Sequence, residues 1–190
     1  MNKMFFLAAG FAALLLTACG GEEKKDDKKE EKKEVSAETK EKFESLQAGW
    51  STIDGMITTI DGALASYDVD KQTAYLDSMK TVAGKAKKDV QAQALPLIDS
   101  LVVLNNMVDV WKMTLNGEKE TWGMITEDFT AVMTSIEKGE AEEEKLAARA
   151  EGFTIQFEAK TEILNDIAAN WAKIDANSAA LKSLFPAATK

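Results

Sequence analysis

The feature that most constrains the fold is an unbroken series of apolar residues, at alternating steps of three and four, between residues 43 and 67. The series comprises Phe43, Leu46, Trp50, Ile53, Ile57, Ile60, Leu64 and Tyr67. This spacing draws one apolar stripe along an α-helix and is typical of the a and d positions of a coiled coil. Such a helix must bury its stripe against other helices, so the sequence predicts a helical bundle.

Three further stretches repeat the helical spacing. The second, from about Lys71 to Leu115, carries Leu76, Met79, Ala83, Ala86, Val90, Leu97, Leu101, Leu104, Val108, Trp111 and Leu115. The third carries Trp122, Ile125, Phe129, Val132 and Ile136, and the fourth carries Phe153, Phe157, Leu164, Ile167, Trp171, Ile174, Leu181 and Phe185. No strand pattern competes with these stripes. The predicted fold class is all-α: an elongated antiparallel four-helix bundle with coiled-coil-like a/d seams over residues 36–185, followed by a tail at 186–190.

The expected helix boundaries follow from capping and turn residues. Ser36 is expected to start the first helix and Asp70 to cap the second. Asn116-Gly117 is read as the next turn. Pro96 lacks a backbone N–H donor, so we expect it to kink or end the second stretch near Ala92.

The last turn has two candidate positions, Gly139 and Gly152. A turn at Gly152 divides the remaining chain into two helices of about 50 Å each, which match the first helix in length. We therefore favour Gly152, and Gly139 stays open as the alternative. With these turns Trp111 and Trp122 would flank one turn, and Trp50 and Trp171 would lie at a similar height.

Residues 1–18 have the pattern of a signal peptide. Lys3 supplies a positive charge, and the apolar run from Met4 to Leu16 is too short to span a hydrocarbon layer of about 30 Å. The segment Leu16-Thr17-Ala18-Cys19-Gly20 resembles a bacterial lipobox. The alternative is an ordinary signal peptide followed by a chance cysteine.

The lipobox resemblance implies where the protein lies and how it is held there. A signal peptidase would recognise Leu16, Thr17, Ala18 and Cys19 and cleave before Cys19. The cysteine would then carry a diacylglyceryl thioether and, on its new amine, a fatty acid such as palmitate. Two or three acyl chains hold a protein stably on a membrane, whereas one does not. The resemblance therefore implies a lipoprotein anchored in the outer membrane.

A charged segment separates this cysteine from the predicted bundle. Residues 20–34 read GGEEKKDDKKEEKKE, with seven acidic residues, six lysines and no apolar side chain to bury. We expect residues 19–35 to form a disordered tether. Lys25-Asp26-Asp27 and Lys29-Glu30-Glu31 resemble the export signal of surface-displayed lipoproteins in Bacteroidetes. A plain hydrophilic stalk is the alternative, so the side of the outer membrane, outward or periplasmic, stays open.

Composition excludes several classes of function. The 190 residues include no His and one Cys, and their formal net charge is −9. Without His, the usual zinc and iron sites and His-dependent acid–base mechanisms are excluded. The acidic balance argues against nucleic acid as a partner. We expect no metal, no cofactor, no catalytic residues and no enzymatic activity.

The sequence thus predicts a lipid-anchored helical bundle of the cell envelope with a non-catalytic binding or structural role. The expected partners are the membrane and an envelope or extracellular protein, and the oligomeric state stays open. The alternative function is binding of a small apolar ligand between the helices. Its pocket would be lined by Trp50, Trp111, Trp122 and Trp171, which are otherwise read as large core residues.

Overall fold

The computed structural model describes residues 35–186, which form four α-helices and no strand. The helices are α1 (Ala37–Ala65), α2 (Val69–Gly84), α3 (Lys88–Glu137) and α4 (Glu143–Leu184). The predicted all-α fold class and the bundle of four helices are confirmed.

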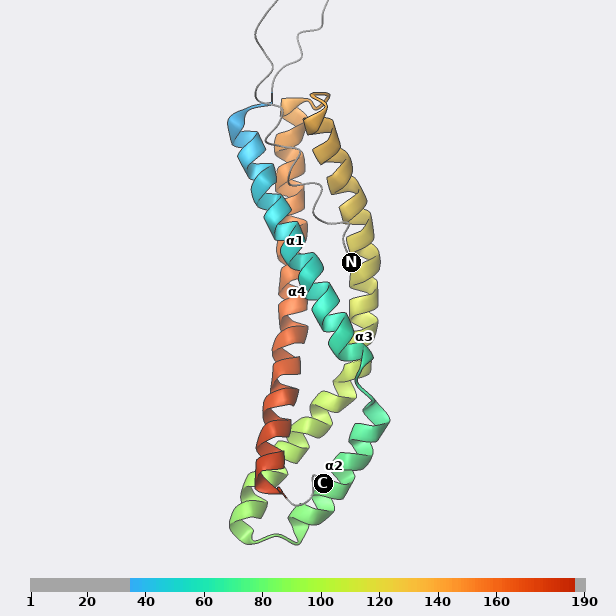
Figure 1. The fold of residues 1–190 in the computed structure, drawn as a ribbon, viewed down its shortest axis with the longest axis vertical. Coiled ribbons are helices and arrows are strands. Elements are labelled where there is room, and N and C mark those ends of the chain that lie inside the picture. The colour runs from blue at the N-terminus through green and yellow to red at the C-terminus, as the bar shows by residue number, and fades with distance from the viewer. Residues whose placement is uncertain (1–34, 187–190) are drawn as a thin grey trace, which may run out of the picture. The chain divides into compact units, whose positions relative to one another are not determined.

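The four helices are arranged around α3, which packs against all the others. Figure 1 shows α1 crossing α4 and reaching α3 with its C-terminal end, from where α2 continues beside α3, while α4 runs antiparallel to α3. α1 packs on α3 and α4, whereas α2 packs on α3. We call residues 35–66 and 113–170 the proximal half, because α1 and α4 begin there, and residues 67–112 and 171–186 the distal half.

The predicted seam of α1 is confirmed by burial. Phe43, Ile53, Ile57, Ile60 and Leu64 are buried, and Leu46, Trp50 and Tyr67 pack against the core. The α4 seam is equally regular: its buried residues are Leu146, Ala150, Phe153, Phe157, Lys160, Leu164, Ile167, Ile174 and Leu181. Their alternating steps keep one face of α4 turned toward the bundle interior over the full length of the helix.

The helix starts were predicted in part. Ser36 caps α1 as expected, because its Oγ accepts a hydrogen bond from the Thr39 N–H at 3.2 Å. The expected cap at Asp70 is wrong. Asp68 caps α2 instead, and its Oδ1 accepts from the Lys71 N–H at 2.9 Å. Asp70 then lies in the first turn of α2, where its negative charge faces the positive end of the helix dipole.

The turn expected at Asn116-Gly117 is wrong, because both residues lie inside the continuous helix α3. The chain turns instead between Gly84 and Lys88. Pro96 lies downstream of this turn, inside α3, and does not end the helix. Tertiary packing explains the difference. Trp111, Leu115 and Trp122 are buried on one face of α3 on both sides of the glycine, so continuing the helix buries apolar surface that outweighs a local cost of about 1 kcal/mol for glycine.

The preferred turn at Gly152 is also wrong, and the alternative at Gly139 is the one observed. Gly139 has φ 65°, in the left-handed region. Its N–H donates to the Ile136 carbonyl at 3.1 Å, and the Glu140 N–H donates to the Ser135 carbonyl at 2.9 Å. These two bonds form a Schellman motif, which ends α3. The length argument failed because α3 is matched in length by α1 and α2 together, rather than by α1 alone.

Candidate functional site

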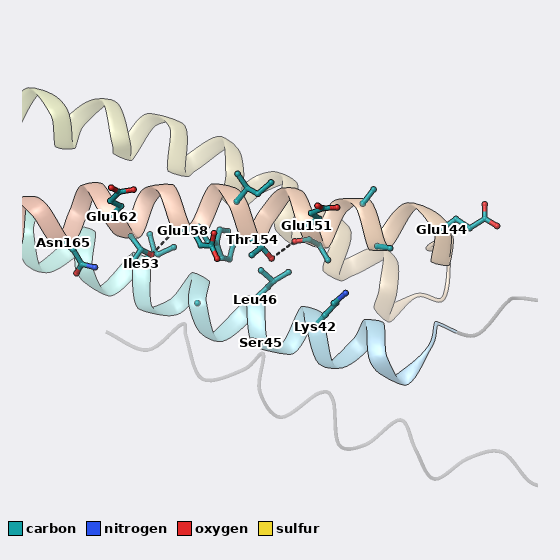
Figure 2. Close-up of a pocket in the computed structure, with 17 residues that line it drawn as sticks. Lys42, Ser45, Leu46, Ile53, Glu144, Glu151, Thr154, Glu158, Glu162 and Asn165 are labelled. Carbon is teal, nitrogen blue, oxygen red and sulfur yellow. Dashed lines mark hydrogen bonds between the residues drawn. The ribbon is translucent and has the colours of Figure 1, made fainter.

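A surface groove of about 1340 Å³ lies between α1 and α4. Its α1 side extends from Lys42 to Ile53, and its α4 side from Glu144 to Asn165. Figure 2 shows side chains of both helices along the groove, with Lys42 on α1 and Glu144 near the start of α4. At 1.5 Å per residue the α4 side is about 30 Å long, which is the length of a helix of about 20 residues.

The floor of the groove is apolar and firmly held. Leu46, Ile53 and Phe157 line it, and the rings of Phe157 and Trp122 lie 5.4 Å apart. Phe157 also contacts Phe129, with the ring centroids 5.7 Å apart. Clustered aromatic rings of this kind resist rearrangement, so the floor is a preformed surface.

Small residues leave room in the groove for the backbone of a bound segment to approach its floor. Ser45 and Gly49 line it on α1, and Ala147 and Ala150 line it on α4. A Cβ atom added at Gly49 would lie 3.4 Å from Phe157 Cδ2. The absence of a side chain at Gly49 therefore keeps the floor open above this ring.

The rim of the groove is acidic. Four glutamates line it on α4, and one lysine, Lys42, lines it on α1. The glutamates are Glu144, Glu151, Glu158 and Glu162, all exposed to solvent. The first three are spaced by seven residues, so they project from the same side of α4. An apolar floor with carboxylates at heptad spacing is complementary to a helix that carries apolar residues on one face and lysine or arginine beside it.

One carboxylate closes the proximal end of the bundle near this groove. Glu143 accepts hydrogen bonds from Ser36 Oγ at 2.7 Å, Thr39 Oγ1 at 2.5 Å and the Ser36 N–H at 3.0 Å. These bonds hold the pKa of Glu143 below its usual value, and the bond from the Ser36 hydroxyl has the largest effect. Glu143 thereby joins the first turn of α4 to the first turn of α1, and it faces the positive ends of both helix dipoles.

The four tryptophans do not share one site. Trp50 stacks on Trp122 with ring centroids 6.5 Å apart, and its Nε1–H donates to Thr126 Oγ1 at 3.1 Å. Trp171 packs edge-on against Tyr67 at 5.2 Å, at the boundary between the two halves. The expectation that Trp50 and Trp171 share one height is therefore wrong, and Trp111 and Trp122 flank no turn because both lie in α3. None of the four tryptophans lines the α1–α4 groove.

The other predicted site residues lie outside the described residues. These are Leu16, Thr17, Ala18 and Cys19 of the lipobox, and Lys25, Asp26, Asp27, Lys29, Glu30 and Glu31 of the expected export signal. They stay predictions from the sequence.

Sequence reasoning missed the charged pair in the bundle interior. Lys160 Nζ of α4 contacts Glu118 Oε2 and Thr121 Oγ1 of α3. Lys160 and Glu118 occupy positions in the two apolar seams, between Phe157 and Leu164 and between Leu115 and Trp122. A charged residue at a seam position was the available signal. The heptad repeat of Glu144, Glu151 and Glu158 was the corresponding signal for the rim of the groove.

Comparisons with protein-family models, with curated proteins and with solved structures found no match to this chain. Within residues 35–186, no three His, Cys, Asp or Glu side chains lie close enough together to hold a metal ion. α3 has the length and composition to cross a membrane, a test that the core helix of a soluble protein also passes. The fold and the groove thus define the class of the described part of the chain: a four-helix bundle with an acidic-rimmed groove between α1 and α4.

Proposed function

We propose that this protein is a non-catalytic, lipid-anchored binding protein of the bacterial cell envelope, and that it binds a basic amphipathic helix in the α1–α4 groove. The observation that carries the binding role is the groove itself, in which four glutamates flank an apolar floor with a single lysine opposite. The anchoring role rests on Cys19 in its lipobox-like context.

Charge supports a basic partner over an acidic or neutral one. The proximal half, which contains the groove, carries 18 acidic and seven basic residues, a net charge of −11. The distal half carries seven acidic and eight basic residues, a net charge of +1. A field concentrated at one half attracts cationic ligands to that half and repels anionic ones.

Shape supports a helix over a small molecule. The groove is open along its length and lined by side chains over six turns of α4, whereas small-ligand sites enclose most of the ligand surface. Ile155, 61% exposed, adds an apolar contact on the α4 side. A helix laid on this surface would become an additional neighbour of α1 and α4, as in helix-in-groove recognition.

Binding can be tested with the full chain and a designed peptide. The probe is a fluorescent 21-residue helix with leucine at the a and d positions and lysine at the e and g positions, and its control carries glutamate in place of lysine. We expect only the lysine peptide to bind, and binding to weaken as salt is added. Absence of a preference for the lysine peptide would refute a basic partner.

Matched variants locate the binding surface. Replacing Glu144, Glu151 and Glu158 by Gln should weaken binding about tenfold, because each exposed charge pair contributes about 0.5 kcal/mol. The control replaces Glu41, Glu137 and Glu140 by Gln, three exposed residues that do not line the groove, and it changes the net charge equally. Equal losses in both triple variants would show attraction by net charge alone and would remove the groove from the proposal.

Anchoring and display need a separate experiment. Intact cells are treated with protease, and the released fragments are identified by mass spectrometry, with Cys19→Ala as the control. Release of a stable fragment beginning near Ser36 would place the bundle outside the cell. Protection until the outer membrane is opened would exclude surface display and favour a periplasmic position. Unchanged membrane association of Cys19→Ala would refute the lipid anchor.

A further inference from the structure

A second surface, on α3, lies apart from the groove and carries no role in the proposed function. Its apolar side chains are unusually exposed: Val103 is 63% exposed, Val110 48% and Met113 74%. Val102 and Met107 extend the same surface. A monomer rarely leaves such a continuous apolar strip in water unless something covers it.

The strip has the spacing of a helix–helix contact. Asp99, Val103, Asn106, Val110, Met113 and Gly117 follow steps of four and three on the exposed side of α3. Asp99, the charged member, lies toward the distal end and pairs with Lys80 at 3.7 Å. α3 therefore has two seams, one facing the bundle and one facing solvent. Asn106 lies near the centre of the exposed seam, where a polar residue can fix the register of two paired helices.

The charge distribution selects the orientation of a partner helix. Parallel association of two copies through this seam would place two proximal halves of net charge −11 side by side, which is repulsive. Antiparallel association around Asn106 would instead overlap the nearly neutral distal halves. A two-fold axis at the centre of the seam therefore gives the arrangement of lowest repulsion.

Antiparallel pairing also brings opposite charges together. Lys85, Lys87 and Lys88 form a basic turn between α2 and α3, and none of the three pairs with an acid among residues 35–186. This turn lies about 30 Å from Asn106 along α3, and Glu120 and Glu127 lie about 20 to 30 Å from it in the opposite direction. A two-fold axis at Asn106 thus superposes the basic turn of one copy on the acidic stretch of the other.

We propose that the exposed seam of α3 binds a second copy of this chain in an antiparallel, two-fold symmetric dimer with Asn106 at the axis. Val103 of one copy then packs against Val110 of the other, and the interface is isologous, as in most homodimers. Lys85 and Lys88 of each copy face Glu120 and Glu127 of its partner. The α1–α4 groove stays free in both copies, so the dimer presents two grooves.

Disulfide trapping tests both the pairing and its direction. Asn106→Cys, Gly117→Cys and Ala172→Cys are introduced singly into the full chain, and the cell fraction that contains the protein is treated with a thiol oxidant. All three positions are exposed, so none should disturb the fold. In the antiparallel dimer the two copies of residue 106 meet, whereas the two copies of residue 117 lie about 33 Å apart.

We expect a disulfide-linked dimer from Asn106→Cys, and no more dimer from Gly117→Cys or Ala172→Cys than from the unmodified chain. Equally strong self-linking of Gly117→Cys would show a parallel pair and overturn the proposal. No dimer from Asn106→Cys, or a link to a different protein, would overturn it as well.

Charge exchange provides an independent test in the Asn106→Cys background. Lys85→Glu with Lys88→Glu should reduce the trapped dimer about tenfold, because the new carboxylates would then face the glutamates of the other copy and repel them. Adding Glu120→Lys and Glu127→Lys to the same chain should restore it. Failure of the second pair to restore the dimer would overturn the antiparallel register. Ala172→Lys, an exposed charge change on α4, is the control and should leave the dimer unchanged.

Discussion

Lys160 of α4 and Glu118 of α3 form an ion pair inside the bundle, where their side chains are only 10% and 17% exposed. The Lys160 ammonium group also donates a hydrogen bond to the Thr121 hydroxyl. The pair joins the two longest helices in the proximal half, close to the floor of the groove. Because both residues occupy seam positions, a shift of one helix along the other would separate the charges and bury each of them alone.

Breaking this pair should be costly, and replacing it as a whole should not. We expect Lys160→Ala to lower the free energy of unfolding by about 3 kcal/mol, because Glu118 would keep a poorly solvated charge. The double variant Lys160→Met with Glu118→Leu should be about as stable as the wild type. Urea unfolding of the single and double variants measures both values. A double variant as unstable as Lys160→Ala would show that the pair contributes net stability.

The link between Glu143 and Ser36 should make stability depend on acid pH. The pKa of Glu143 is lowered in the folded protein, so its contribution is present above the unfolded value of about 4.3 and is lost as pH falls through the folded pKa. We expect the stability difference between wild type and Glu143→Gln to shrink between pH 6 and pH 3. Thermal unfolding across this range measures it.

Tyr67 should produce the opposite dependence at alkaline pH. Burial, and then the negative charge of Asp175, raise the pKa of Tyr67. A raised folded pKa contributes stability that is complete below the unfolded value of about 10 and is lost as pH rises above it. We expect Tyr67→Phe to lose less stability than the wild type between pH 9 and pH 11.5. Parallel alkaline curves for the two proteins would place Tyr67 in an ordinary aqueous environment.

The seams were predictable from the sequence because burial of an apolar stripe is repeated over many turns. A single polar residue does not hide the repeat: Asn105 lies buried in the α3 seam, where its Nδ2 donates to Thr73 Oγ1 at 2.9 Å. The alternating apolar positions of α1 therefore predict both its helix and its buried face. The exposed seam of α3 was not predicted, because apolar residues at helical spacing do not by themselves distinguish a buried face from an exposed one.

The turns and the groove were less predictable because both depend on which helices are neighbours. Gly117 and Gly139 are the same residue type in similar polar surroundings, yet α3 continues through the first and ends at the second. The difference lies in the apolar residues that follow: Trp122 resumes the seam after Gly117, whereas residues 140–145 are mostly charged. The groove requires α1 beside α4, a pairing that no local pattern specifies.

Alanine substitution at three glycines tests where the turns lie. Gly139→Ala should lower the free energy of unfolding by about 1 kcal/mol, because φ 65° is strained for any residue with a Cβ atom. Gly117→Ala and Gly152→Ala should each raise it by about 0.5 to 1 kcal/mol, since both positions are helical and a Cβ atom there meets nothing within 4 Å. Urea unfolding of the three variants checks these signs. A destabilising Gly152→Ala together with a stabilising Gly139→Ala would place the last turn at residue 152 and would dismantle the α4 rim on which the groove depends.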